Sequence, residues 1–398
     1  MKNRPAVFCL ALAVAATTLC AVGDCVWKGN SGNWSNPDNW TGGVPTSEDI
    51  ASFPKSSAGY TVTVDCEAQC KYLRHENGSG SGKITFTGSG AGTLTCSGSA
   101  VGPSVSGYLS SNTKVAFTNI TANLGAFNPW NGNLIIEDGA NIRMGTLYMN
   151  GGTSTLTVNG GDLYVVNVSI RTACSLIFNG GTTSLPNVDC RNNNNVDCAV
   201  AYKLHGGKVL LRGVPLNYGN AIIDFTGGEL HWTTASFSPI NDGAWLPKSG
   251  GKLVLKRDSY TALTTEPRYD YAIQLDGAIY ITNMLDRCTN DNPTSTPGVY
   301  AYTNTTFTGS GELYANYIFV RGTCTVDIAK LCLGHRTHFT NEKCVMLVPN
   351  GTTFGAYGDW TSVYNNAYSY FFGPITVDTT DCFDRATPPL HNLRSHRS

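Results

Sequence analysis

Apolar and polar residues alternate along positions 150–255, and a Gly-Gly pair interrupts this alternation again and again. Counted from the second glycine of a pair, the second and fourth residues are mostly apolar in successive repeats. A period of two residues is typical of β-strands that bury one face. We therefore predict a short strand after each pair, with these residues pointing inward: Leu163 and Val165, Val209 and Leu211, Leu230 and Trp232, Leu253 and Leu255.

The Gly-Gly pairs also recur at a nearly constant interval. From Gly160 onward they return every 20 to 26 residues, at Gly180, Gly206, Gly227 and Gly250. Self-similarity at this period indicates a repeat architecture, in which each unit buries its apolar face against its neighbours. The interval matches one coil of a parallel β-solenoid, so we predict an all-β fold made of a single elongated domain.

Asparagine stands immediately before three of the pairs, at Asn150, Asn159 and Asn179. Asparagine tolerates left-handed backbone geometry, and its amide can hydrogen-bond to the same residue one coil away. Asn159 and Asn179 are one repeat apart, so we predict that they stack in adjacent coils. The nine-residue gap between Asn150 and Asn159 places Asn150 at another corner.

Charged residues occupy the same outward position in three successive repeats, at Lys208, Glu229 and Lys252. Because coils are spaced about 4.8 Å apart, we predict a ladder of alternating charge in which each contact contributes about 0.2–1 kcal/mol. The functional alternative is that Glu229 and His231, which share one strand face, form an acid/base pair. The pattern favours a solvated strand face.

Three of the seven tryptophans lie within 14 residues of one another, at Trp27, Trp34 and Trp40. An uncapped solenoid end would expose both strand edges and core, so the favoured interpretation is a cap in which these rings cover the open end. The alternative is that Trp34 and Trp40 are exposed and stack on sugar rings.

The segment from Trp27 to Phe53, which contains Gly32-Asn33-Trp34-Ser35, is followed by the alternating run Tyr60–Asp65 and then by the Gly-Gly repeats. This order resembles the bacterial secreted, autotransporter-type (adhesin-like) β-helix proteins with an N-terminal tryptophan-rich motif. The resemblance spans residues 24–398. It implies a right-handed parallel β-helix, export from the cell, and a surface or adhesin-like role.

The first 23 residues have the pattern of a secretory signal peptide. Lys2 and Arg4 form a basic start, residues 6–16 form an apolar core, and Ala21-Val22-Gly23 forms a small-residue cleavage site. A membrane anchor would need about 20 apolar residues, and Thr17 and Thr18 interrupt this run. We therefore expect a secreted or cell-surface protein with no integral membrane segment after signal removal.

Charge gives little indication of a polyanionic partner. Charged residues make up 14% of the chain, and loss of Lys2 and Arg4 reduces the 27 basic residues to 25, against 28 acidic residues, a formal net charge of −3. Such a balance lacks the basic footprint of a nucleic-acid-binding protein. The expected partners are surface glycans or other surface proteins.

Fourteen cysteines less Cys9 and Cys20 leave twelve, an even number that is typical of an oxidising compartment. Cys190 and Cys198 flank an asparagine-rich run and form the predicted disulfide, whose closure would stabilise the fold by about 2–3 kcal/mol. Cys96 falls at an inward position of a strand and is interpreted as a small buried side chain. Two other local pairs are candidates: Cys66 with Cys70, and Cys324 with Cys332.

Metal and cofactor chemistry has only one candidate, the set Cys332, His335, His338 and Cys344. Its spacing fits no zinc-finger pattern, and an exported chain more often oxidises its cysteines. We therefore predict neither a metal site nor a cofactor.

Enzymes that cleave polysaccharides on a β-helix need a carboxylate pair, or acids that hold calcium beside a basic residue. The chain contains no Asp-Asp pair and no Gly-His-Gly motif, and Asp189 and Asp197 lie in the context of a turn. We predict no catalytic residue. The expected function is a non-enzymatic adhesive or structural role, and the alternatives are a β-helix polysaccharide lyase or hydrolase, or a carbohydrate-binding module.

The expected organisation is a signal peptide at 1–23, a tryptophan-rich cap at 24–56, a parallel β-helix at 57–350, and an aromatic-rich C-terminal segment with a disordered tail at 351–398. Between Ala262 and Val299 the rhythm loosens around Pro267, Pro293 and Pro297, which predicts an excursion from the coil.

Overall fold

The computed structural model describes most of the chain up to residue 257 and shorter stretches beyond it. The described residues are 23–75, 80–90, 92–98, 107–108, 113–129, 131–190, 198–212, 222–233, 236–237, 246–257, 262–264, 271–283, 298–301, 304–320, 323–339, 345–348, 353–356, 368–372, 376–378 and 394–396. The predicted signal peptide lies outside them, apart from Gly23. Among the residues described, no helix is long and apolar enough to span a bilayer.

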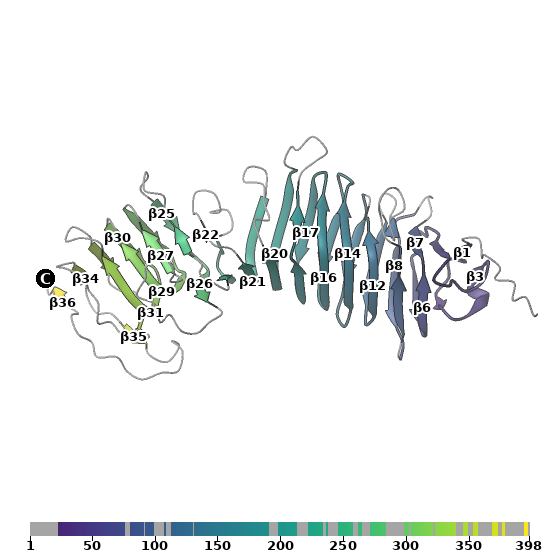
Figure 1. The fold of residues 1–398 in the computed structure, drawn as a ribbon, viewed down its shortest axis with the longest axis horizontal. Helices are drawn as coiled ribbons and strands as arrows, with labels where there is room; N and C mark the ends of the chain where they lie inside the picture. The colour runs from purple at the N-terminus through teal and green to yellow at the C-terminus, as the bar shows by residue number, and fades with distance from the viewer. Residues whose placement is uncertain are drawn as a thin grey trace, which may run out of the picture.

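The chain winds into an all-β parallel solenoid of about 10 turns across residues 24–331, elongated along the direction in which the coils stack (Figure 1). One coil contains β15 (Thr155–Val158) and β16 (Asp162–Ile170). The next coil contains β17 (Cys174–Phe178), β18 (Thr182–Leu185) and β19 (Val188–Asp189). β15 pairs in parallel with β17, and β16 pairs in parallel with both β18 and β19. The fold predicted from the repeat interval is confirmed.

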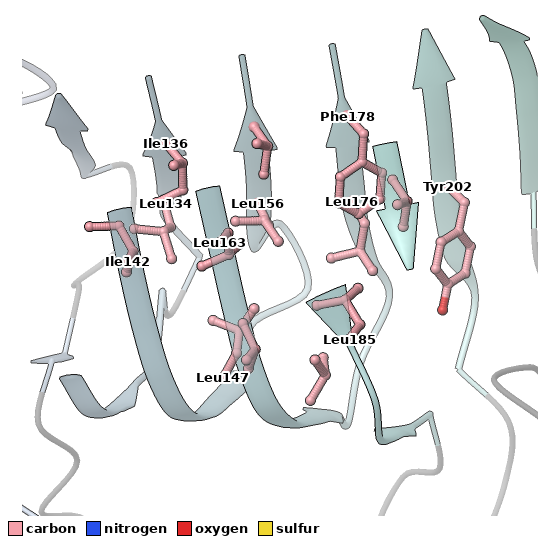
Figure 2. Packing of buried hydrophobic residues seen from close by; sticks show 14 of the residues in the cluster. Leu134, Ile136, Ile142, Leu147, Leu156, Leu163, Leu176, Phe178, Leu185 and Tyr202 are labelled. Atoms are coloured by element: carbon pink, nitrogen blue, oxygen red, sulfur yellow. The ribbon is translucent and has the colours of Figure 1, made fainter. Parts of the chain in front are cut away.

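Successive coils stack in register, so inward side chains form continuous columns. Leu134 pairs with Leu156, Leu156 with Leu176, and Leu176 with Tyr202. Each is at most 1% exposed. Figure 2 shows these side chains projecting from neighbouring strands into one interior. Burial of a leucine stabilises a fold by about 1.5–3 kcal/mol, so this column holds the coils together.

The remaining strands follow the same stacking in three sheets. Within the described residues these sheets have 25, six and five strands. The 25-stranded sheet also contains β2 (Gly32–Asn33), β5 (Tyr60–Val64), β6 (Glu67–Cys70), β8 (Lys83–Gly88), β9 (Thr93–Cys96), β11 (Lys114–Thr118), β12 (Thr121–Phe127), β13 (Asn133–Ile136), β14 (Asn141–Met149), β20 (Val200–Arg212), β21 (Ile222–Thr233), β22 (Ser236–Phe237), β23 (Gly251–Arg257), β24 (Ala262–Thr264), β26 (Ala278–Asn283), β27 (Gly298–Ala301), β29 (Glu312–Val320), β31 (Lys330–Phe339), β33 (Thr353–Ala356) and β35 (Thr376–Asp378).

The two smaller sheets lie toward opposite ends of the solenoid (Figure 1). The six-stranded sheet contains β25 (Tyr271–Gln274), β28 (Thr305–Thr308), β30 (Thr323–Asp327), β32 (Val345–Val348), β34 (Tyr368–Phe372) and β36 (Arg394–His396). The five-stranded sheet contains β1 (Asp24–Trp27), β3 (Trp40–Thr41), β4 (Ile50–Phe53), β7 (Tyr72–His75) and β10 (Gly107–Tyr108), and a short 3-10 helix, η1 (Pro37–Asn39), precedes β3.

In four of the repeated Gly-Gly pairs the second glycine takes a left-handed backbone and forms a corner of the coil; these glycines are Gly161, Gly181, Gly207 and Gly228. The φ angle is +68° at Gly161 and +67° at Gly181, a region that residues with a Cβ rarely adopt. The corners also stack closely, since a Cβ on Gly181 would collide with the carbonyl oxygen of Gly161. The pair Gly151-Gly152 lies at another corner, between β14 and β15, as the position of Asn150 predicted.

Strands continue where the sequence pattern weakened. β24, β25 and β26 all lie within 262–283, so the coil persists through part of the region in which the prolines predicted an excursion. Beyond residue 350, β33 to β36 pair in parallel with strands of preceding coils. The strand ladder therefore extends past the expected boundary between the β-helix and an aromatic-rich segment with a disordered tail.

Candidate functional site

Trp34 and Trp40 are buried at the N-terminal end of the solenoid. Their exposed fractions are 0% and 3%. Their ring centroids lie 4.9 Å apart in an edge-to-face arrangement, and Nε1 of Trp40 donates to the backbone oxygen of Trp34 at 2.8 Å. Phe53 packs against Trp40 and connects this cluster to Phe86 in the first coils. Both indole rings are buried, so neither has an exposed face on which a sugar ring could stack. The geometry fits the cap interpretation and not carbohydrate stacking.

Cys190 and Cys198 lie close together on either side of residues 191–197, which are outside the described residues. The backbone N–H of Cys198 donates to the carbonyl oxygen of Cys190 at 3.0 Å, and both side chains are buried. Cys174 lies in the same corner: burial, together with these two thiols, raises its pKa to about 12. The described cysteines carry no disulfide bond in this structure. The Cys190–Cys198 bridge therefore stays a prediction, with Cys174 as a competing partner.

A second cysteine pair links adjacent coils. Cys70 and Cys96 are register partners on β6 and β9, and both are buried. A hydrogen bond with Cys96 raises the pKa of the Cys70 thiol well above its usual range, and burial adds to the shift. The cross-coil neighbour of Cys70 is thus Cys96, which the sequence identified only as a small buried side chain.

The three charges of the predicted ladder lie in register on β20, β21 and β23, and Lys252 and Glu229 form an ion pair. Lys208 is in register with Glu229, and Glu229 with Lys252. Nζ of Lys252 donates to Glu229 Oε1 at 3.0 Å. On the same strand, Nε2 of His231 lies 2.8 Å from Glu229 Oε2. Hydrogen bonds from His231 and Lys252 hold the pKa of Glu229 below its usual value.

Glu229 and His231 therefore form the hydrogen-bonded pair that catalysis would require, but their surroundings differ from those of an active site. Burial lowers the pKa of His231 more than its bond to Glu229 raises it. The residues in register with His231 in the two adjacent coils are Leu210 and Val254. Neither supplies a nucleophile or a second acid, so the geometry favours the solvated strand face.

Further along the same face, two tyrosine rings continue the ladder. Tyr280 and Tyr314 stack with centroids 4.1 Å apart and an interplanar angle of 7°. Nζ of Lys252 lies 4.5 Å from the Tyr280 centroid, and Nζ of Lys330 lies 5.5 Å from the Tyr314 centroid. Each ring therefore contacts another ring and a cation.

A polar groove lies between coils on another face of the solenoid. It has a volume of about 530 Å³ and is lined by residues of β14, β16, β19 and β20. Asn187 donates from Nδ2 to Oδ1 of Asn167 at 3.3 Å. Thr146 is in register with Asn167, which gives a polar column across three coils. Tyr148, Ser169 and Asp189 form a second column.

Two arginines supply the positive charge of this groove. Nη1 of Arg171 lies 3.1 Å from Oδ2 of Asp189, and their side chains are 35% and 52% exposed. Arg212 also lines the groove and is exposed. Asp189 was considered as a candidate acid because of its position near a loop. Among the described residues, Asp189 is the acid that lines this groove. Asp197 lies outside the described residues.

Three of the four residues of the suggested zinc set lie on described strands. Cys332, His335 and His338 lie on β31, and Cys344 lies outside the described residues. Among the part of the chain that is described, no group of three or more His, Cys, Asp and Glu residues could hold a metal ion.

The sequence did not single out Arg171, Arg212 or the pair Asn167 and Asn187. One signal was present: Asn167 and Asn187 are separated by the same 20 residues as the stacked pair Asn159 and Asn179. No regular spacing in the sequence marked the two arginines, because their side chains come together only through the places where neighbouring strands end.

Comparison with known proteins does not identify the chain beyond its fold class. No family model matches the chain, and neither curated proteins nor solved structures include a significant match. The chain is a parallel β-solenoid.

Proposed function

We propose that the chain is an exported, non-enzymatic β-solenoid that acts in adhesion or as a structural element at or beyond the cell surface. The observation that carries this proposal is the pairing of outward polar groups between coils. Asn179 bonds to Asn159, Lys252 to Glu229, and Tyr280 stacks on Tyr314. Side chains engaged in such lateral contacts stabilise a long, regular surface.

The arrangement of carboxylates supports a binding role over hydrolysis. Glycoside hydrolases place two carboxyl groups about 5–5.5 Å or about 6.5–9.5 Å apart across the scissile bond. Asp189 contacts Arg171, and Glu229 contacts His231 and Lys252. The carboxylates of these two clusters thus contact cations or imidazole.

Export is supported by the N-terminal sequence and by the cysteines. Residues 1–23 have the three parts of a signal peptide, and an even number of cysteines would remain after its removal. The resemblance of the tryptophan segment to autotransporter-type proteins points in the same direction. A surface-displayed solenoid would present its long lateral faces to glycans or to other proteins.

The test is a glycan array run beside a polysaccharide degradation screen on purified residues 24–398. Degradation is followed by new reducing ends, which report hydrolysis, and by unsaturated uronate absorbance, which reports elimination. We expect retention on glycans or on cell surfaces without either product. Catalytic formation of either product would overturn the proposal and favour the polysaccharide lyase or hydrolase alternative.

The carbohydrate-binding alternative has one specific observation in its favour, the polar groove that contains Arg171 and Arg212. Binding at this groove is compatible with an adhesive role, because adhesion to a glycan requires recognition without cleavage.

A further inference from the structure

From the groove between β16 and β20 we infer a binding site for an acidic polysaccharide, in which Arg171 and Arg212 contact carboxylate or sulfate groups of the sugar chain. This inference rests on the proposed function, because it names the class of ligand that the surface of the solenoid would hold. The ligand class is inferred from the residues that line the groove, from their charge and from the position of the groove across several coils.

The groove exists because the coil that follows β16 breaks its strand. β18 ends at Leu185, Pro186 follows, and β19 contains two residues. Proline has no N–H and cannot donate to a strand ladder. Asn187 partly replaces the lost contacts, since its side chain donates to the backbone oxygen of Val166 at 3.2 Å. Residues of this interruption, among them Pro186 and Asn187, line the groove.

Hydrogen-bonding groups repeat along the groove at the spacing of the coils. Asn167 and Asn187 lie on adjacent coils, and Thr146 occupies the coil before them. Coils are about 4.8 Å apart, so successive sugar units of a chain lying along the solenoid would meet a similar polar group at each step. Tyr148 adds an aromatic ring to the lining, and such rings have an apolar body suited to sugar faces.

The charge of the groove selects an acidic ligand. Arg171, Arg212 and Asp189 together carry one net positive charge at neutral pH. A guanidinium has five N–H donors in a planar fork, and the Arg212 guanidinium that lines the groove is exposed. Carboxylate and sulfate oxygens match this fork in charge and geometry.

Two other ligand classes fit the groove less well. Calcium requires six to eight oxygen ligands, with carboxylates prominent among them, whereas Asp189 is the acid that lines the groove within the described residues. Nucleic acid would be expected to engage a broad basic surface, but the whole chain has a formal net charge of −1. An acidic sugar chain needs only a few cations beside neutral donors.

The experiment measures binding of acidic and neutral oligosaccharides of equal length to purified residues 24–398 by titration calorimetry. The probes are oligogalacturonate, a chondroitin sulfate oligosaccharide, a malto-oligosaccharide and single-stranded DNA. We expect one acidic oligosaccharide to bind in preference to the neutral one, with affinity that falls as salt increases. No preference for an acidic oligosaccharide, or tighter binding of DNA, would overturn the inference.

Variants locate the binding in the groove. Arg171→Gln should weaken binding of the acidic probe by about 10-fold or more, because a hydrogen bond to a charged group is worth at least that factor. Arg171→Lys should lie between the wild type and Arg171→Gln, since it keeps the charge and loses the fork. Arg74→Gln is the matched control, because Arg74 forms a surface ion pair with Asp24 at 2.7 Å and does not line the groove.

Asp189→Asn should not weaken binding of the acidic probe, in contrast to Arg171→Gln. This substitution removes a negative charge that repels the acidic probe, so binding of that probe should be unchanged or tighter. Weakening as large as that of Arg171→Gln would overturn the inference, as would equal losses in Arg171→Gln and Arg74→Gln. Thermal unfolding of each variant identifies any loss that comes from misfolding.

Failure of this inference is distinguishable from failure of the proposed function. If the chain adheres to cells or glycans and the groove variants behave as wild type, the groove assignment fails and the adhesive role stands. If acidic oligosaccharide is bound in the groove and then cleaved, the groove assignment stands and the non-enzymatic role fails.

Discussion

Nδ2 of Asn179 donates to Oδ1 of Asn159 at 2.9 Å, joining the same corner of two adjacent coils. This confirms the stacking predicted from their spacing. We expect Asn159→Ala and Asn179→Ala each to lower the free energy of unfolding, with a coupling energy of about 0.5–1.5 kcal/mol in a double-mutant cycle. Urea denaturation of the two single variants and the double variant measures it. Strict additivity would show that the amides do not interact.

The corner glycines give a matched pair of variants. Gly181→Ala should destabilise the fold by about 2 kcal/mol or more, because it combines a left-handed backbone with a collision against Gly161. Gly152→Ala should change stability by less than about 1 kcal/mol, and toward greater stability, since no atom lies within 4 Å of its added Cβ. Chemical denaturation compares the two, and equal effects would contradict the role of the corner.

Glu229 should make the charge ladder sensitive to acid. Its pKa is lowered from an ordinary value of 4.5 by His231 and Lys252, so its stabilising effect is fully present above pH 4.5. That effect disappears as pH falls through the lower folded-state pKa. Because Glu229 is partly exposed, Glu229→Gln should cost at most about 1 kcal/mol at pH 7.

The measurement is urea denaturation of wild type and Glu229→Gln at neutral and acidic pH. The difference between them should narrow below pH 4.5. Glu67→Gln, which removes an exposed carboxylate on β6, is the control for net charge. A difference that grows on acidification would refute the ion-pair account.

Loss of a tryptophan of the cap should lower the stability of the fold. Trp34→Ala removes a fully buried ring and should lower the free energy of unfolding by about 3–5 kcal/mol, with increased aggregation as the coil end opens. Tyr164→Ala, which removes a ring that is 43% exposed, is the control and should have a much smaller effect. Thermal unfolding and light scattering provide the readouts. A stable Trp34→Ala variant that loses only glycan binding would instead support sugar stacking.

Peptide mapping without reduction tests the cysteine corner. In protein isolated from an oxidising compartment we expect a peptide in which Cys190 is bonded to Cys198, and we expect Cys174→Ser to retain it. Reduction should then lower stability by about 2–3 kcal/mol. A peptide that joins Cys174 to either residue would show that proximity in the fold, and not the short loop, decides the pairing.

The regular parts of this fold could be predicted from the sequence because their causes are local and repeated. Alternation placed Leu163 and Leu230 inside, and both are at most 1% exposed. Equal spacing placed Asn179 on Asn159 and Lys252 on Glu229. A repeat fixes such contacts because one coil brings each position back to the same point.

Contacts that depend on uneven coils were decided only by the tertiary structure. Tyr280 and Tyr314 stack although they are 34 residues apart, because the intervening coil is longer than the repeat. The polar groove likewise depends on Pro186 and on the short β19, which bring Arg171, Asp189 and Arg212 together from different coils. By itself the sequence determined the period, the buried face and the glycine corners, since these follow from backbone geometry and apolar burial. Only the stacking of coils of unequal length decided which outward side chains converge.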